Sequence, residues 1–164
     1  MEYVPVKMIK QNINDFPVFK LPAEFNCRQF KKGDEETWSE IESAVDEFDN
    51  PEKALEHFQN EFGEYIHHME KRCIFLENSE GKAFGTATAW YNNSFKGEYW
   101  GRLHWVAIKP EYQGKGLGKS LVYEAIKLLK KCHNKAYLTT QTTSFIAIKI
   151  YIDFGFKPYI TDKN

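Results

Sequence analysis

The sequence has no long apolar run and no repetitive segment. No stretch approaches the roughly 18 apolar residues of a membrane-spanning helix. Lys7, Lys10 and Asp15 interrupt the N-terminal segment where a signal peptide would have its apolar core. We find no internal repeat, linker or low-complexity tract. These absences argue against a membrane partner and predict a cytoplasmic location.

Net charge and cysteine are also scarce. The formal net charge is −1 over 164 residues, which argues against a nucleic-acid partner. The three cysteines, Cys27, Cys73 and Cys132, are odd in number and far apart, and none lies in a CxxC or Cys/His ligand spacing. We therefore expect reduced thiols in an intracellular compartment and no metal site.

What the sequence does have is the composition of one globular domain with a strongly uneven charge. Hydrophobic residues make up 42% and charged residues 27% of the chain. Residues 34–64 contain 12 acidic residues and one lysine. These carboxylates are either the solvated faces of two helices or a ring at the mouth of a site that attracts a cationic amine.

Hydrophobic periodicity predicts a mixture of strands and helices. Asp34 would cap a helix from Glu35, and the pair Asn50 and Pro51 would start a second helix that continues to Met69. Two further helices are expected at 117–132 and 145–154, and strands at 25–30, 73–77, 83–91, 99–108, 135–140 and 156–160. The apolar runs at 3–9 and 16–21 contain or adjoin prolines, which fits edge strands or an extended arm.

A glycine-rich turn between a buried strand and an amphipathic helix carries the clearest chemical signal. Gly114, Gly116 and Gly118 alternate there, and the free N–H groups at the start of a helix can hold phosphate oxygens. A Walker A loop would need its first glycine at position 113, which is Gln, and a dinucleotide fingerprint would need GxGxxG instead of GxGxG. Both of these nucleotide loops fit poorly.

The segment IKPEYQGKGLG, residues 108–118, resembles position by position the acyl-coenzyme A loop of the GCN5-related N-acetyltransferase (GNAT) family. YIDFGF at 151–156 is similar to the closing helix of that family, and residues 21–41 resemble its opening strand and helix. The resemblance implies a mixed α/β fold, a twisted mixed central sheet flanked by about four helices, in a domain over residues 21–164. Residues 1–20 would be an N-terminal extension or edge strands.

The resemblance also implies an activity and a cofactor site. Members of the GNAT family are N-acetyltransferases that move an acetyl group from acetyl-CoA to a primary amine. The amine attacks directly in a ternary complex, without a metal. The amine would belong to a small molecule or a peptide. The pantetheine arm would lie in a gap between the strand ending at Ile108 and the strand at 136–139. The implied cofactor-binding residues are Val106, Ile108, Gln113, Gly114, Lys115, Gly116, Leu117, Gly118, Lys119 and Ser144.

Three residues are candidates for proton transfer. Tyr151 lies where the family often has a tyrosine that protonates the coenzyme A thiolate, although an aromatic residue in this helix is otherwise expected in the core. His104 lies where some arylalkylamine acetyltransferases have a histidine that helps to remove the amine proton. Other relatives use a glutamate and a water chain, for which Glu98 is the nearest carboxylate.

Two departures from the family pattern affect these expectations. Ser144 stands where the family commonly has an asparagine that contacts the cofactor, so the serine either makes this contact or acts only as a helix cap. Relatives usually continue into another strand after 156–160, so either the N-terminal segment or a second subunit would cover the sheet edge. A homodimer is the expectation that follows.

The sequence alone does not identify the acceptor amine, and it leaves two alternative functions. Aromatic residues either line an acceptor pocket or belong to the core: Trp38, Trp90, Tyr91, Trp100 and Trp105. One rival is a non-catalytic module that senses acyl-CoA. The other is a phosphate-binding NTPase, which the short glycine loop disfavours.

Overall fold

The computed structural model describes residues 5–141 and 145–159. Helices and strands follow one another along the chain as β1 (Pro5–Lys10), β2 (Asn26–Gln29), α1 (Glu35–Ala44), α2 (Pro51–Phe62), α3 (Ile66–Arg72), β3 (Cys73–Glu77), β4 (Ala83–Phe95), β5 (Glu98–Ile108), the 3-10 helix η1 (Pro110–Tyr112), α4 (Leu117–Cys132), β6 (Ala136–Gln141), α5 (Phe145–Asp153) and β7 (Lys157–Pro158). The predicted mixed α/β fold is confirmed, and the described residues form five α-helices where about four were expected.

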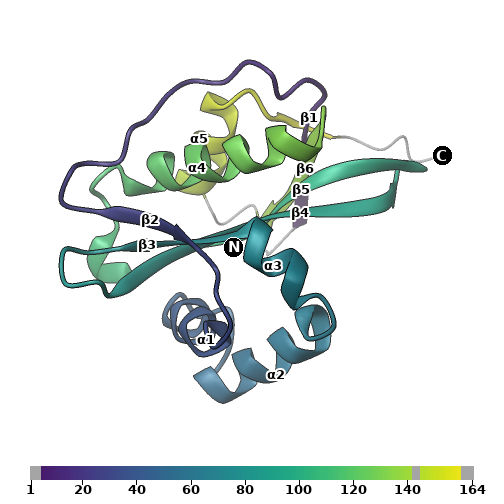
Figure 1. Cartoon of the computed structure of the whole chain (residues 1–164). Coiled ribbons are helices and arrows are strands. Elements are labelled where there is room, and N and C mark those ends of the chain that lie inside the picture. Colours follow the sequence, from purple (N-terminus) through teal and green to yellow (C-terminus); the bar gives the residue numbers. More distant parts are fainter. Residues whose placement is uncertain (1–4, 142–144, 160–164) are drawn as a thin grey trace.

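One mixed sheet of seven strands runs through the molecule in the order β2-β3-β4-β5-β6-β1-β7. The pair β5–β6 is parallel, and the other neighbouring pairs are antiparallel. Helices α1 and α2 cover one face of the sheet, and α4 and α5 cover the other (Figure 1). Each face therefore has its own apolar core, one around Phe58 and Phe62 and the other around Leu121 and Leu129.

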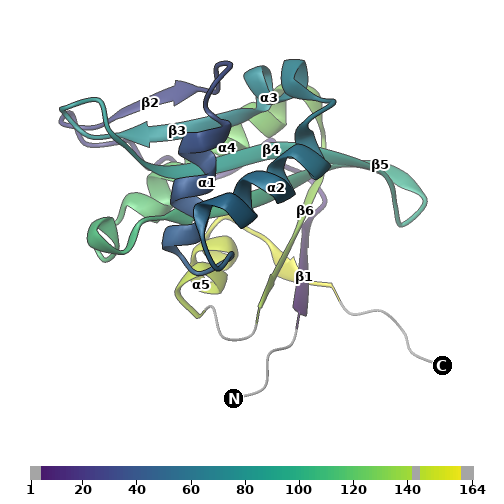
Figure 2. The same ribbon diagram turned by 90° about the horizontal axis from the view of Figure 1, so that it is seen from below.

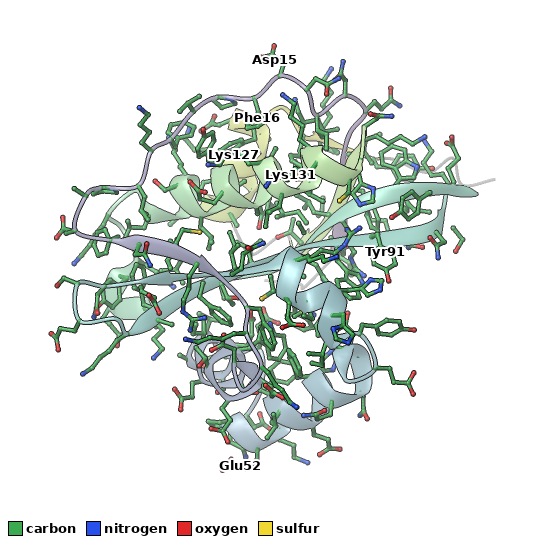
Figure 3. All side chains as sticks on the ribbon, viewed as in Figure 1. Asp15, Phe16, Glu52, Tyr91, Lys127 and Lys131 are labelled. Atoms are coloured by element: carbon green, nitrogen blue, oxygen red, sulfur yellow. The ribbon has the colours of Figure 1, made fainter. Side chains whose placement is uncertain are left out.

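Of the two alternatives for residues 16–21, an edge strand or an extended arm, the structure shows no strand: this stretch is part of an irregular segment that crosses α4 (Figure 1). Phe16 lies against that helix, with its ring 5.9 Å from the ring of Tyr123 and 5.8 Å from Nζ of Lys130 (Figure 3). Ile13 is fully buried in the same core. The segment is held on the outer side of α4 by the packing of its side chains and not by hydrogen bonds to a neighbouring strand.

The expected edge position of the first strand is also corrected. β1 lies between β6 and β7, and Met8 is fully buried. Pro5 is tolerated because it is the first residue of the strand, while β7 pairs only with Met8 and Ile9.

The helix predicted from Pro51 to Met69 is two helices. It stops after Phe62 at Gly63, and α3 begins at Ile66. Glycine costs about 1 kcal/mol in a helix interior relative to alanine, which favours a break there. The apolar period continues across the break because Phe62 and Met69 pack in the same core.

The caps of the first two helices differ in kind. Asn50 caps α2 as predicted, accepting a hydrogen bond from the backbone N–H of Lys53 at 2.9 Å. The predicted side-chain cap by Asp34 is wrong: its carboxylate accepts two hydrogen bonds from Arg28 at 2.7 and 3.0 Å, and one from the backbone N–H of Lys31. A bidentate guanidinium is a stronger partner than one backbone N–H.

A β-bulge in β5 prepares the site. Thr86 pairs with Ala107 and Thr88 pairs with His104, so two residues of β5 lie opposite one of β4, and Trp105 has a φ of +53°. Beyond this point β5 diverges from β6, whose strand runs at a steep angle to β4 and β5 (Figure 2). Among the described residues, the ladder between β5 and β6 joins Gly101 to Ala136 and Arg102 to Tyr137.

Candidate active site

A cavity of about 380 Å³ lies where β5 and β6 separate. The wall from β5 comprises residues 102–106 and the wall from β6 comprises residues 138–140. The rest of the lining comes from Pro5 of β1, Glu42 of α1, Glu47 just after α1, and Ala147 and Tyr151 of α5. The gap expected between these strands is thus present, with polar groups from both faces of the sheet.

The glycine turn joins the end of β5 to α4 through the short helix η1. Gly114 and Gly116 both have φ of +78°, and a side chain placed on either would meet no atom within 4 Å. These two glycines provide left-handed backbone and leave open space beside it. Gly116 is also the N-cap of α4, whose first turn has no acidic residue, so free N–H groups and a positive helix end face this space.

The third glycine has a different task. Gly118 lies inside α4, and a Cβ there would be 3.0 Å from Cδ1 of Ile150 in α5. Its small size lets α4 and α5 approach each other, so only part of the glycine pattern serves the turn. Leu117 is buried beneath the turn, as expected for its apolar side chain.

The remaining predicted cofactor residues lie in three places. Val106 lines the cavity, while the Ile108 carbonyl accepts a hydrogen bond from the Gln113 side chain at 2.8 Å. Lys115 and Lys119 are at the turn: Nζ of Lys115 is 5.6 Å from the ring centre of Tyr112, and Nζ of Lys119 is 3.7 Å from Oδ2 of Asp153. Ser144 lies outside the described residues.

Tyr151 reaches the cavity from the opposite side, on α5. The helix ends close behind it, and Gly155 has a φ of +94°, the left-handed conformation that commonly follows the end of a helix. The side chain is 7% exposed. Burial, and after it the neighbouring Glu42 carboxyl, raise the pKa of Tyr151, so the phenol is protonated and able to donate.

His104 lines the same cavity and belongs to a hydrogen-bonded cluster around Glu61. Its Nε2 is 2.6 Å from Oε2 of Glu61, and the other carboxylate oxygen is bound by Trp105 and His57 at 2.9 and 2.8 Å. Burial opposes the ionisation of Glu61, but these hydrogen bonds outweigh it and lower its pKa to about 2.

The two partners of this pair have different charge states at neutral pH. Burial lowers the pKa of His104 in spite of the Glu61 carboxylate, so the ring is neutral. A neutral ring that donates its Nε2–H to Glu61 leaves an unprotonated Nδ1. Glu61 thereby sets the tautomer that a proton acceptor requires.

Glu98 is not brought to these groups. It begins β5 at the end where β5 and β6 are still paired, its side chain is 57% exposed, and it forms an ion pair with Lys135 at 2.8 Å. The cavity lining includes no part of it. Among the three candidates for proton transfer, the structure therefore brings together Tyr151 and His104.

Two carboxyl groups of the site were missed from the sequence. Glu42 and Glu47 both line the cavity. Glu42 is 1% exposed, and burial, reinforced by Glu47, raises its pKa well above the ordinary value. The signal was present: Glu42 follows Trp38 by four residues on α1 and so falls on the helix face that is buried.

The aromatic residues divide between core and cavity. Trp38, Trp90 and Trp100 are 9% exposed or less and belong to the apolar clusters. Trp105 lines the cavity and packs its ring 5.4 Å from that of Trp38. Tyr91 lies on β4, where Arg72 is 4.7 Å from the centre of its ring (Figure 3). Of the proposed acceptor aromatics, only Trp105 is a wall residue.

No set of three or more His, Cys, Asp or Glu side chains within 5–141 and 145–159 is arranged to hold a metal ion. Within the same residues, no helix has both the length and the apolar character needed to cross a membrane.

Comparison with known proteins gives a family match and structural matches. The profile described as the acetyltransferase (GNAT) family matches residues 35–156. No curated protein matches the chain. A GCN5-related N-acetyltransferase from Sphaerobacter thermophilus superposes with a TM-score of 0.66 and 19% identity, over 96% of this chain and 50% of that one.

Two other solved structures extend this picture. A GNAT-family acetyltransferase from Colwellia psychrerythraea has a TM-score of 0.70 and 11% identity, over 96% of this chain and 54% of that one. A protein from Pyrococcus horikoshii has a TM-score of 0.69 and 17% identity, over 85% and 93%. The chain thus spans about half the length of the first and second of these relatives. At these identities the likeness shows a shared fold.

Proposed function

The chain belongs to the acetyltransferase (GNAT) family, and on this premise we propose that it transfers the acetyl group of acetyl-CoA to a primary amine. The observation that carries the proposal is the cavity between β5 and β6, which has Tyr151 on one wall and His104 on another. The open glycine turn lies at the end of β5, from which a pyrophosphate on its N–H groups would leave the thioester arm in reach of the cavity.

The residues present fit the cosubstrate by their chemistry. Left-handed glycines at 114 and 116 let a phosphate approach the backbone without meeting a side chain. Val106 and the unpaired part of β5 offer backbone groups to an extended amide chain. Where β6 diverges from β5, the backbone N–H and C=O groups of β5 on that side have no strand partner among the described residues. The amides of pantetheine can form the same hydrogen bonds with these groups as a peptide strand would.

The proposed proton transfers follow from the charge states of the side chains. The ammonium nitrogen gives up two protons in the reaction, and the coenzyme A sulfur takes up one. Neutral His104 accepts the proton lost before the attack, through the Nδ1 that Glu61 leaves free. As the C–N bond forms and the C–S bond breaks, Tyr151 gives its phenolic proton to sulfur, and the second proton from nitrogen restores the phenol.

A thiol-release assay over a panel of primary amines, with a Tyr151→Phe variant, tests this function. We expect the native protein to release coenzyme A from acetyl-CoA only when an acceptor amine is present. In the variant we expect kcat to be lower by about 100-fold or more, because the leaving thiolate lacks its proton donor. Tyr99→Phe is the matched control, since Tyr99 is 48% exposed and is not among the residues that line the cavity. Unchanged turnover in Tyr151→Phe would remove Tyr151 as the acid.

Thermal-shift measurements with acetyl-CoA, ATP and NAD test the ligand class independently of turnover. Acetyl-CoA should raise Tm, since a ligand that binds only the native state stabilises it. Stabilisation by ATP alone would contradict the proposal. Stabilisation by acetyl-CoA without turnover of any amine would favour the acyl-CoA sensor instead.

A further inference from the structure

Glu42 is a buried carboxyl that the proposed proton transfers do not use. It is 1% exposed, and its Oε2 has no hydrogen-bond partner in the part of the chain that the structure describes. Buried polar side-chain atoms almost always have a partner, because leaving one unpaired costs its full desolvation. Since Glu42 also lines the cavity, its missing partner has a place to enter.

The charged and titratable groups around Glu42 do not supply that partner. Tyr151 on α5 is a neutral phenol, and Cys73 on β3 is a thiol whose burial raises its pKa to about 12. Glu47, at the end of α1, is a second carboxyl, and its backbone N–H donates to the Glu42 carbonyl at 3.2 Å. Its side chain adds negative charge to the cavity.

Neither of the two basic groups of β5 that line the cavity is paired with Glu42, although Nε of Arg102 is itself buried without a hydrogen-bond partner among the described residues. His104 is neutral and bound to Glu61. The guanidinium of Arg102 lies 5.5 Å from the ring centre of Tyr137, and no ion pair joins Arg102 to a carboxylate among the described residues. Within residues 5–141 and 145–159, no ion pair therefore provides Glu42 with a protein cation.

We propose that Glu42 binds the ammonium group of the acceptor, so that the enzyme selects amines that enter as cations. This rests on the proposed function, which requires an amine beside Tyr151 and His104. An ammonium has three N–H donors, which can satisfy the vacant oxygen of Glu42 and still present one proton to His104. Glu47 at the cavity rim attracts the same charge.

The proposal links acceptor binding to pH. In the empty site burial keeps Glu42 protonated. The charged or titratable groups that line the cavity with it are Glu47, Arg102, His104 and Tyr151, and the Cys73 thiol lies near Glu42 outside this lining. An entering ammonium favours the carboxylate, so binding releases a proton and the acceptor KM falls as pH rises.

The test compares primary alkylamines with analogues that are fully fluorinated from the β-carbon onward, which have a similar shape but are largely neutral at neutral pH. In Glu42→Gln we expect KM to rise about 10- to 100-fold for each alkylamine and to stay unchanged for its fluorinated partner. The amide keeps the shape of the neutral acid, so kcat and the KM for acetyl-CoA should change little. Glu40→Gln on the exposed face of α1 is the matched control.

The outcomes separate this proposal from the proposed function. A native protein that acetylates no amine contradicts the proposed function itself. Equal KM changes for both members of each pair, or no change for either, would overturn only the role of Glu42. The native protein gives a second measurement that needs no variant: its preference for the alkylamine over the fluorinated analogue should increase with pH, and a preference independent of pH contradicts the proposal.

Discussion

Two glutamates of the α1–α2 layer differ in charge because they differ in partners. Glu61 accepts hydrogen bonds from His57, His104 and Trp105, and it stays ionised despite burial. Glu42 is more deeply buried and its Oε2 has no donor within the described residues, so it is held as the neutral acid. The composition of the segment does not distinguish them, and only their hydrogen bonds do.

This difference predicts a pH-dependent gain in stability from Glu42→Gln. The folded pKa of Glu42 lies well above its ordinary value of 4.5, so its contribution to stability is present below that value and is lost as pH rises toward the folded pKa. Glutamine does not titrate. The variant should therefore match the native protein in acid and be more stable in neutral and alkaline solution.

Tm measured across pH for Glu42→Gln and the native protein checks this prediction. Glu40→Gln, which replaces an exposed carboxyl of the same helix, should shift Tm by a small amount that does not grow with pH. A constant difference between Glu42→Gln and the native protein would mean that Glu42 is ionised in the fold.

At the scale of elements, glycines fix where helices and strands can approach. Gly101 lies at the start of the β5–β6 ladder, where its N–H donates to the Lys135 carbonyl at 3.0 Å. A Cβ at this position would be 2.9 Å from the ring of His133 and from Cδ2 of Leu129. The last turn of α4 therefore rests directly on the backbone of β5.

Gly101→Ala should destabilise the protein by about 1–3 kcal/mol, because the added methyl overpacks this contact. Chemical denaturation with a fit to two states measures the change. Gly85→Ala is the control, since a Cβ there meets its nearest atoms at 3.4 Å and should cost less. An equal loss in both variants would show that the effect comes from glycine in a strand and not from the α4 contact.

The sequence predicted those elements whose signals are local. The apolar stripe of α4, the Asn50 cap and the turn with Gly114 and Gly116 depend on residues close together in the chain. The errors arose where distant residues decide. The Asp34 carboxylate binds Arg28 instead of its helix, and a hydrophobic period alone does not report that α2 stops at Gly63.

The same limit applies to the site. Tyr151 and His104 were found because each lies at a fixed distance from the glycine turn or the closing helix in the family pattern. The role of Glu61 depends on contacts between α2 and β5. Glu61 and its partner His104 are 43 residues apart in the sequence. The period of α1 places Glu42 on the buried face, but no local pattern shows that Glu61 binds residues of β5.

At the scale of the whole molecule, the N-terminal strand completes both the sheet and the site. The family profile begins at residue 35, so β1 and β2 lie outside it. Yet β1 pairs with β6 along six residues, from Pro5 with Gln141 to Lys10 with Ala136. Pro5 also lines the cavity. β1 thus supports the wall of β6 after β6 has separated from β5.

Removal of residues 1–10 should therefore abolish the stable fold and not merely trim an arm. It would expose the N–H and C=O groups of β6 as a new sheet edge, which promotes aggregation, and would remove the fully buried Met8 from the core.

Met8→Ala is the milder variant and should lower the free energy of unfolding by about 2–5 kcal/mol. Val18→Ala, at a side chain that is 59% exposed, should change it little. Circular dichroism during heating measures all three, and a truncated protein with native Tm and acetyl-CoA binding would show that β1 is dispensable.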